Sequence, residues 1–172
     1  MLDIRNARIS DADFITATWL RNYRNAPFVK DIPNKAYFYY QHKLIEALFD
    51  RCDEKKVVYD GSRVVDTEDG TFLATGDTQF IKAWIVADAT TEGLIVHYIY
   101  VRPEFRRQGL ATELINYLLD KYDLSAVFYT HKSPMMVMRN LGLSQKARDR
   151  GYIYHPYLAF TTIAHGWEAS GS

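Results

Sequence analysis

The sequence has little cysteine, no net charge and no long hydrophobic run. Its single cysteine, Cys52, excludes an intrachain disulfide and a cysteine-rich zinc site, and we expect no bound metal. The 21 Lys and Arg residues balance 21 Asp and Glu residues, which argues against a general nucleic-acid binder. No run reaches the ~20 apolar residues that span a bilayer, and residues 1–5 do not begin a signal peptide. We therefore expect a cytoplasmic protein that does not bind membranes.

The overall composition is that of an ordinary globular domain. The chain has 172 residues, of which 48% are hydrophobic and 24% are charged. A chain of this length can bury a substantial core as one domain. We place that domain at residues 1–165, expect a frayed tail at 166–172, and expect a monomer or a homodimer.

Apolar periodicity predicts strands and helices that alternate along the chain. Strands are expected at residues 3–9, 56–59, 80–87, 94–101 and 126–130, and a strand or strand pair at 152–160. Helices are expected after a Ser10 cap, at about 35–51, at about 110–122, and from Ser133 to near Gly142. Residues 66–77 read as a loop or hairpin tip. This order favours a mixed α/β fold around a central sheet.

One loop has the features of a phosphate seat. The most strand-like segment, 94–101, leads through Pro103 to Arg106 and Arg107, and a helix starts just after Gly109. Main-chain N–H groups at a helix start have no intrahelical partners and attract phosphate oxygens. Glycine lets a ligand approach the backbone closely, and arginines add positive charge. A Rossmann loop and a P-loop are both excluded, because their glycine patterns are missing.

The run HYIYVRPEFRRQGLA, residues 97–111, resembles the acetyl-coenzyme A motif of the GNAT superfamily of N-acetyltransferases. That motif is Arg/Gln-x-x-Gly-x-Gly/Ala after a strand, and Arg106, Gly109 and Ala111 occupy its defining positions. The resemblance implies a single-domain α/β fold with a mixed, mostly antiparallel central sheet flanked by helices. It also implies transfer of an acetyl group from acetyl-CoA, as co-substrate, to an amine acceptor.

The resemblance also assigns the coenzyme contacts. The strand end is expected to hold the pantetheine arm by its main chain, and the helix after Ser133 is expected to flank the coenzyme. The loop and helix start are expected to cradle the pyrophosphate. The coenzyme-binding residues on the strand are Ile99, Tyr100 and Val101, and those at the junction are Arg106, Arg107, Gln108, Gly109, Leu110, Ala111 and Thr112.

His97 is the candidate that removes the acceptor's proton. A histidine suits this task near neutral pH, and some arylalkylamine-acetylating relatives carry one at this place. Strand alternation predicts that His97 shares a face with Ile99 and Val101. His97 is either the base or water relay, or a half-buried strand histidine bonded to a neighbour.

The usual general acid of the family is absent. The resemblance implies a tyrosine four residues before a Gly-Phe pair, and here Gly142-Leu143 places Met138 at that position. His131 lies near the place of an expected asparagine. A thioether cannot donate a proton. The remaining candidates for this role are water and four side chains, namely Tyr129, Ser133, Tyr152 and His155.

The acceptor site is expected between the early helices, as the resemblance implies. We predict aromatic walls there, with Asp31, Asp69 or Asp77 available to attract a cationic amine. The aromatic candidates are Trp19, Tyr23, Phe28, Tyr37, Phe38, Tyr39 and Tyr40. The segment from Trp19 to Arg24 also resembles phage-encoded members. A small amine, a peptide N-terminus and a protein lysine all stay open, as do a longer acyl group, a hydroxyl acceptor and a non-catalytic coenzyme A-binding or protein-interaction module.

Overall fold

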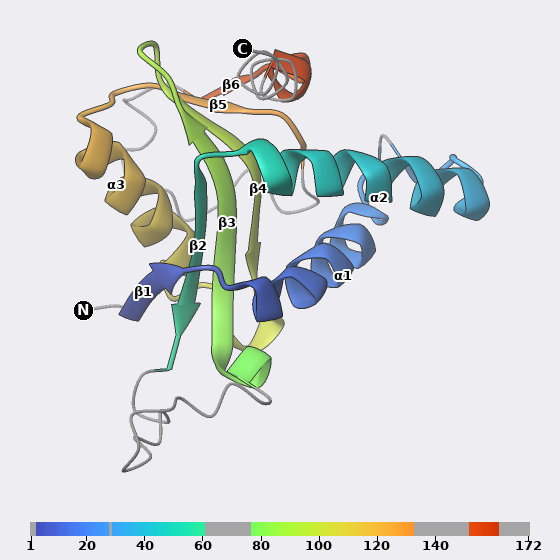
Figure 1. Cartoon of the computed structure of the whole chain (residues 1–172), viewed down its shortest axis with the longest axis horizontal. Coiled ribbons are helices and arrows are strands. Elements are labelled where there is room, and N and C mark those ends of the chain that lie inside the picture. Colours follow the sequence, from blue (N-terminus) through green and yellow to red (C-terminus); the bar gives the residue numbers. More distant parts are fainter. Residues whose placement is uncertain (1–2, 28, 61–76, 133–151, 162–172) are drawn as a thin grey trace.

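The computed structural model describes residues 3–27, 29–60, 77–132 and 152–161 (Figure 1). Short 3-10 helices lie at Ile9–Asp11, Asp77–Phe80 and Pro103–Phe105. The main helices are α1 (Ala12–Tyr23), α2 (Asn34–Arg51) and α3 (Leu110–Tyr122). The strands are β1 (Asp3–Asn6), β2 (Glu54–Tyr59), β3 (Ile81–Ala89), β4 (Leu94–Val101), β5 (Val127–Tyr129) and β6 (Tyr152–Tyr154).

The six strands form one sheet in chain order, β1 to β6. The pairs from β1 to β4 are antiparallel, and β5 pairs in parallel with both β4 and β6. Helices α1 and α2 cover one face of the sheet and α3 covers the other (Figure 1). This arrangement confirms the predicted mixed, mostly antiparallel sheet flanked by helices.

Each face of the sheet has its own apolar core. On the side of α1 and α2, the rings of Trp19, Trp84 and Tyr98 pack together and are almost fully buried. On the other side, leucines of α3 pack against small and β-branched residues of β3 and β4. Burial of an aromatic or leucine side chain contributes roughly 1.5–3 kcal/mol, so the two cores together hold the sheet between its helices.

An extra residue in β4 reverses the side-chain alternation of that strand. Tyr98 pairs with Val86 and Val96 pairs with Ala87, so His97 lies between them as an extra residue in the register. Such a β-bulge lets side chains change faces part-way along a strand. Ile99 and Val101 therefore pack against α3.

His97 turns to the opposite face from Ile99 and Val101. It bonds to Asp88 of β3, which lies two residues beyond Val86 on the α1 and α2 side. The expectation that His97 shares a face with Ile99 and Val101 was wrong, because alternation assumes a regular strand.

The first helix starts differently from the prediction. Strand β1 ends at Asn6, and Ile9 begins a 3-10 turn in which its side chain is 97% exposed. Asp11, which is buried, caps this turn by accepting from the Arg8 main-chain N–H at 2.7 Å and from the Arg5 guanidinium at 2.6 Å. The carboxylate of Asp11, and not the hydroxyl of Ser10, therefore organises the start of α1.

The last predicted strand is only half correct. Strand β6 covers residues 152–154, but residues 158–161 are helical. Pro156 has no N–H to donate to a neighbouring strand. The N–H groups of Leu158, Ala159 and Phe160 instead bond to the carbonyls three residues earlier, as in a tight helical turn.

Several predictions fall outside the described residues. They are the loop at 66–76, the helix from Ser133 to Gly142 with Met138, and the tail at 166–172.

Gly93 provides a test of how closely β4 and β5 approach. A Cβ atom on Gly93 would lie 2.8 Å from the Ala126 carbonyl oxygen and 2.9 Å from a ring carbon of Phe128. We expect Gly93→Ala to lower the free energy of unfolding by about 1–3 kcal/mol, because backbone must move to relieve the overlap. Urea unfolding measures the change. Thr91→Ala, an exposed change in the same turn, is the control, and equal stability of the two variants would contradict this packing.

Candidate active site

Strands β4 and β5 part from each other halfway along β4. Leu94, Ile95 and Val96 pair with Val127–Tyr129, and the Thr130 N–H still donates to the Val96 carbonyl at 3.1 Å. From His97 to Val101, β4 has no pairing partner on that side among the described residues. Among the described residues, β4 from Tyr98 to Val101 thus presents an edge that no strand pairs with, to which an extended ligand can bond.

The basic loop lies directly after this edge and leads into α3. Gly109 is the residue before the helix and has a left-handed conformation, with φ at +81°. Arg107 also has a positive φ of 65°. No side chain caps the helix, so the N–H groups of its first turn lack a capping partner. The residues predicted to hold the pyrophosphate, Arg106 to Thr112, therefore come together at an exposed helix start that favours anions.

A pocket of about 350 Å³ opens between α1 and the end of β4. Its lining includes three arginines and two asparagines, but no Asp or Glu. The residues are Phe14, Thr18, Arg21, Asn22, Asn25, Tyr100, Arg102, Pro103 and Arg106. Sequence reasoning missed the α1 members, since single polar residues on an amphipathic helix look like its solvent face.

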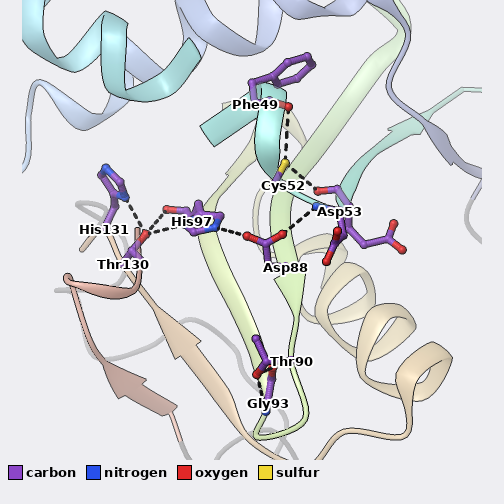
Figure 2. Close-up of polar contacts among 10 residues, drawn as sticks. Phe49, Cys52, Asp53, Asp88, Thr90, Gly93, His97, Thr130 and His131 are labelled. Atoms are coloured by element: carbon purple, nitrogen blue, oxygen red, sulfur yellow. Dashed lines mark hydrogen bonds and ion pairs between the residues drawn. The ribbon is translucent and has the colours of Figure 1, made fainter. Parts of the chain in front are cut away.

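His97 is fully buried at the point where β4 and β5 part, within a chain of hydrogen bonds (Figure 2). Its Nε2 lies 2.8 Å from Asp88 Oδ2, and its Nδ1 lies 3.2 Å from Thr130 Oγ1. The same hydroxyl lies 2.9 Å from His131 Nδ1. His131 Nε2 in turn lies 3.1 Å from the side-chain nitrogen of Gln41 on α2. The chain therefore connects three segments that are distant in sequence.

Donors and acceptors along this chain can be assigned from one end. Asp88, as a carboxylate, only accepts, so Nε2 of His97 carries the hydrogen and Nδ1 accepts from the Thr130 hydroxyl. The hydroxyl oxygen then accepts from Nδ1–H of His131, whose Nε2 accepts from the Gln41 amide. The other oxygen of Asp88 accepts the Asp53 main-chain N–H at 2.7 Å. The four buried polar side chains therefore all have hydrogen-bond partners. They are Asp88, His97, Thr130 and His131.

The order Asp88, His97, Thr130 matches that of a Ser-His-Asp triad, but its chemistry differs. A triad hydroxyl must reach the substrate, whereas Thr130 is only 4% exposed and its oxygen already contacts both histidines. Both ring nitrogens of His97 also have partners. An amine therefore contacts neither group directly, and any proton that reaches His97 has to arrive through an intermediary.

Aromatic rings surround His131 on the α1 side. The Trp19 ring centre lies 5.4 Å from that of His131, and the Tyr23 ring centre lies 4.9 Å from it. Burial lowers the pKa of His131 to about 3, and nearby His97 lowers it as well. Burial raises the pKa of Tyr23 to about 12. At neutral pH both groups are therefore uncharged, as a dry core requires.

The predicted aromatic acceptor walls differ from the pocket that the structure contains. Trp19, Tyr23 and Tyr37 are core residues, whereas the rest of the run on α2 is 43–69% exposed. None of these residues lines the pocket between α1 and β4. Asp31 is exposed and also lies outside that lining, while Phe28, Asp69 and the side chain of Asp77 lie outside the described residues.

The proton-donor candidates that the structure describes lie in or just after β5 and β6. Tyr152 pairs with Val127, which also pairs with Leu94, so it lies level with the start of β4 and not with His97. Its ring packs on the α3 side, and the structure does not bring these two predicted catalytic residues together. Tyr129 pairs with Val96 at the point where the strands part, and burial raises its pKa. His155 is exposed beyond β6, and Ser133 lies outside the described residues.

Three residues of the hydrogen-bond chain were missed in the sequence: Asp88, Thr130 and Gln41. Asp88 directly follows the apolar run from Trp84 to Ala87 in β3. An acidic residue next to such a buried run indicates that its carboxylate has a buried partner. Thr130 carried no signal, since threonine is common in strands.

Within the described ranges, no helix is long and apolar enough to cross a bilayer. No group of three or more His, Cys, Asp or Glu side chains in those ranges is arranged to hold a metal ion.

Comparison with known proteins assigns the family. A sequence model of the acetyltransferase (GNAT) family matches residues 26–133, more than half of the chain. The chain therefore belongs to the GNAT family of acetyltransferases, which use acetyl-CoA. No curated protein matches the sequence.

Several solved structures match the chain at low identity and with TM-scores below 0.5. A possible acetyltransferase from Clostridium difficile 630 is 17% identical with a TM-score of 0.46, over 100% of this chain and 90% of that one. A GNAT family acetyltransferase from Brucella melitensis, in complex with acetyl-CoA, is 17% identical with a TM-score of 0.44, over 72% and 69%. A ribosomal-protein-alanine N-acetyltransferase from Brucella melitensis biovar Abortus 2308 is 15% identical with a TM-score of 0.41, over 96% and 90%. The family match does not address a phage-encoded origin, which stays a prediction.

The neutral state of His131 predicts a pH dependence of stability. The folded ring binds a proton only below about pH 3, whereas the unfolded ring binds one below about pH 6.5. Between these values the unfolded state holds more protons, so the free energy of unfolding falls as the pH drops from 6.5, by up to about 1.4 kcal/mol per pH unit. Urea unfolding at pH 7 and pH 5 measures this loss.

His131→Asn should remove most of that pH dependence, because the amide keeps a donor for Thr130 but does not titrate. His42→Asn, on the exposed side of α2, is the matched control. If the His131 variant loses as much stability between pH 7 and pH 5 as the wild type, another group is responsible.

Proposed function

We propose that this protein transfers the acetyl group of acetyl-CoA to the nitrogen of an amine. The observation that carries the proposal is the junction at Gly109, where an uncapped helix start follows an unpaired strand edge. The N–H groups of this first turn bind the pyrophosphate, and Arg106 and Arg107 add charge. Main-chain groups of Ile99, Tyr100 and Val101 hold the pantetheine arm as an added strand would.

The parting of β4 and β5 sets where the reaction takes place. An arm bound along β4 towards His97 brings the thioester to the point where the two strands separate. There the acceptor nitrogen attacks the thioester carbonyl carbon, the C–S bond breaks, and the coenzyme leaves as a thiolate. The nitrogen loses one proton and the thiolate gains one, so holding the two reactants in line supplies much of the rate.

His97 takes part as a proton relay. Its ring is held by Asp88 and Thr130, so a proton from the acceptor reaches it through a bridging water and the Thr130 hydroxyl. The carboxylate of Asp88 then stabilises the imidazolium, as in other histidine–carboxylate pairs. Tyr152 lies level with the start of β4, and water serves as the proton donor to the thiolate in its place.

Coenzyme binding is the first test of the proposed function. Calorimetric titration of the protein with acetyl-CoA should give a saturable signal, and an amine panel should release free coenzyme thiol. Gly109→Glu should weaken binding at least 100-fold, because it places a carboxylate at the helix start that seats the phosphates. Gly109→Ala carries the same strain at positive φ without the charge, and is the control.

The outcomes of this test are distinct. Absence of binding at millimolar acetyl-CoA would overturn the proposed function. Binding without turnover on any amine would favour a non-catalytic coenzyme A-binding module. A normal affinity in Gly109→Glu, with its fold intact by circular dichroism, would move the phosphate seat elsewhere.

Variants of His97 separate a proton relay from a structural role. His97→Ala should lower kcat about 100-fold and change the pH profile of the rate, in line with the usual contribution of general base catalysis. His97→Gln keeps a donor towards Asp88 but accepts no proton, so it should be equally slow with better stability. Recovery of activity in His97→Gln, or an unchanged pH profile in His97→Ala, would show that His97 only supports the fold.

A further inference from the structure

The pocket between α1 and the end of β4 has an unbalanced charge. Arg21, Arg102 and Arg106 all line it, and none of its described lining residues is Asp or Glu. In the part of the chain that the structure describes, none of the three forms an ion pair with a carboxylate. Three guanidinium groups around one small space raise the local potential, which an anionic ligand would relieve.

Main-chain carbonyls hold two of these arginines in place. Arg102 donates to the Ile81 and Thr78 carbonyl oxygens at 2.6 and 2.7 Å, and its guanidinium lies 4.7 Å from the ring centre of Phe14. Arg106 donates through Nε to the Val101 carbonyl at 3.1 Å. A carbonyl fixes the direction of a guanidinium but leaves its full charge, so both side chains stay charged and positioned beside the pocket.

Arg21 completes the pocket from α1. Its Nε bonds to the Ala17 carbonyl one turn earlier at 3.2 Å, and within the described ranges its terminal nitrogens form no hydrogen bond. Asn22 lies beside it and accepts from the Tyr98 hydroxyl through its side-chain oxygen, so its amide hydrogens can still serve as donors. The pocket thus offers a guanidinium and amide donors from one helix, which is a chemistry suited to carboxylate or phosphate oxygens.

The pocket adjoins the seat of the coenzyme pyrophosphate, because Arg106 belongs to both. The rest of that seat lies at the start of α3, whose Leu110 packs into the core on one face of the sheet. Arg21 lies on α1, and Tyr100 packs into the core on the opposite face. Because the α1 side of the pocket faces away from α3, an anion bound by Arg21 belongs to the second substrate.

We infer that the acceptor is a zwitterionic molecule, with its carboxylate or phosphate bound in this pocket and its amine at the point where β4 and β5 part. This inference rests on the proposed acetyl transfer. Tyr100 in the pocket wall lies three residues beyond His97, which at about 3.3 Å per residue is about 10 Å. The anion and the amine of the acceptor are therefore on the order of 10 Å apart, and the arginines repel a polycationic amine.

A matched pair of acceptors tests the inference. 6-Aminohexanoate has an amine and a carboxylate at about this spacing, and 6-aminohexanamide differs only in lacking the charge. The wild type should have a kcat/KM at least about tenfold higher for the carboxylate, as a charge-assisted contact predicts. Arg21→Gln should remove that preference by slowing the carboxylate alone. Arg21→Lys should keep most of it, and Lys35→Gln, which removes an exposed cation from α2, should leave it unchanged.

Coenzyme affinity in the same variants shows whether the pocket binds an anion of the acceptor or a phosphate of the coenzyme. The KM and calorimetric Kd of acetyl-CoA should be the same in Arg21→Gln and in the wild type. A weaker coenzyme affinity in this variant would assign the arginine to a coenzyme phosphate and overturn the inference. An equal loss of activity with both acceptors would also overturn it, because a merely structural role moves both.

Binding measurements distinguish a failure of the proposed acetyl transfer from a failure of the proposed anion pocket. If acetyl-CoA does not bind, the proposed function fails. If it binds without turnover, the coenzyme-bound protein is titrated with each aminohexanoyl compound by calorimetry. Tighter binding of the carboxylate in the wild type, lost in Arg21→Gln, would support the anion pocket. Equal binding of the two compounds would overturn it.

Discussion

The extra residue at His97 in β4 is the constraint on which the rest of the site depends. A regular strand would turn Leu94, Val96, Tyr98 and Tyr100 to one face. With the bulge, the first two face α3 and the last two face α1. The bulge also coincides with the last residue that pairs with β5. One inserted residue therefore sets both the exchange of faces and the unpaired edge after it.

This exchange gives the two halves of the molecule different chemistry. On the α3 side, aliphatic packing holds a helix whose start is uncapped and suited to anions. On the α1 side, large rings, buried hydrogen bonds and an arginine-lined pocket lie together. The family assignment explains the first half, because acetyltransferases of this type share a coenzyme site. The second half is where this chain has features of its own.

Local patterns predicted the elements that frame the coenzyme site. Strand β4 and helix α3 have the bounds that their periodicity indicated, because each has one strongly apolar face and clear turn signals at its ends. The motif around Gly109 then pointed to the family. The fold class followed from the order of elements, and the family comparison supports it.

Non-local contacts account for what the sequence could not predict. The bulge depends on pairing with β3, and no residue type marks it in advance. The hydrogen bond between His97 and Thr130 spans 33 positions, so the local sequence around either residue does not indicate its partner. Ser10 was predicted as the cap, but the carboxylate of Asp11 takes this role at the preceding 3-10 turn, where it also accepts from Arg5. Pro156 signalled a break, but the direction of the chain beyond it depended on tertiary packing.

The buried hydrogen-bond chain has a consequence for the order of the site at rest. In ice, and in rows of hydrogen-bonded water molecules, the hydrogen bonds along a chain can point in either direction. The two opposite arrangements interconvert. Here Asp88 can only accept, so every bond from Gln41 inward points towards it. With Asp88 ionised and both histidines neutral, the dipoles along the chain therefore point in the same direction. The environment of His97 is therefore polarised before any substrate arrives, and little reorientation is left to oppose the movement of a charge.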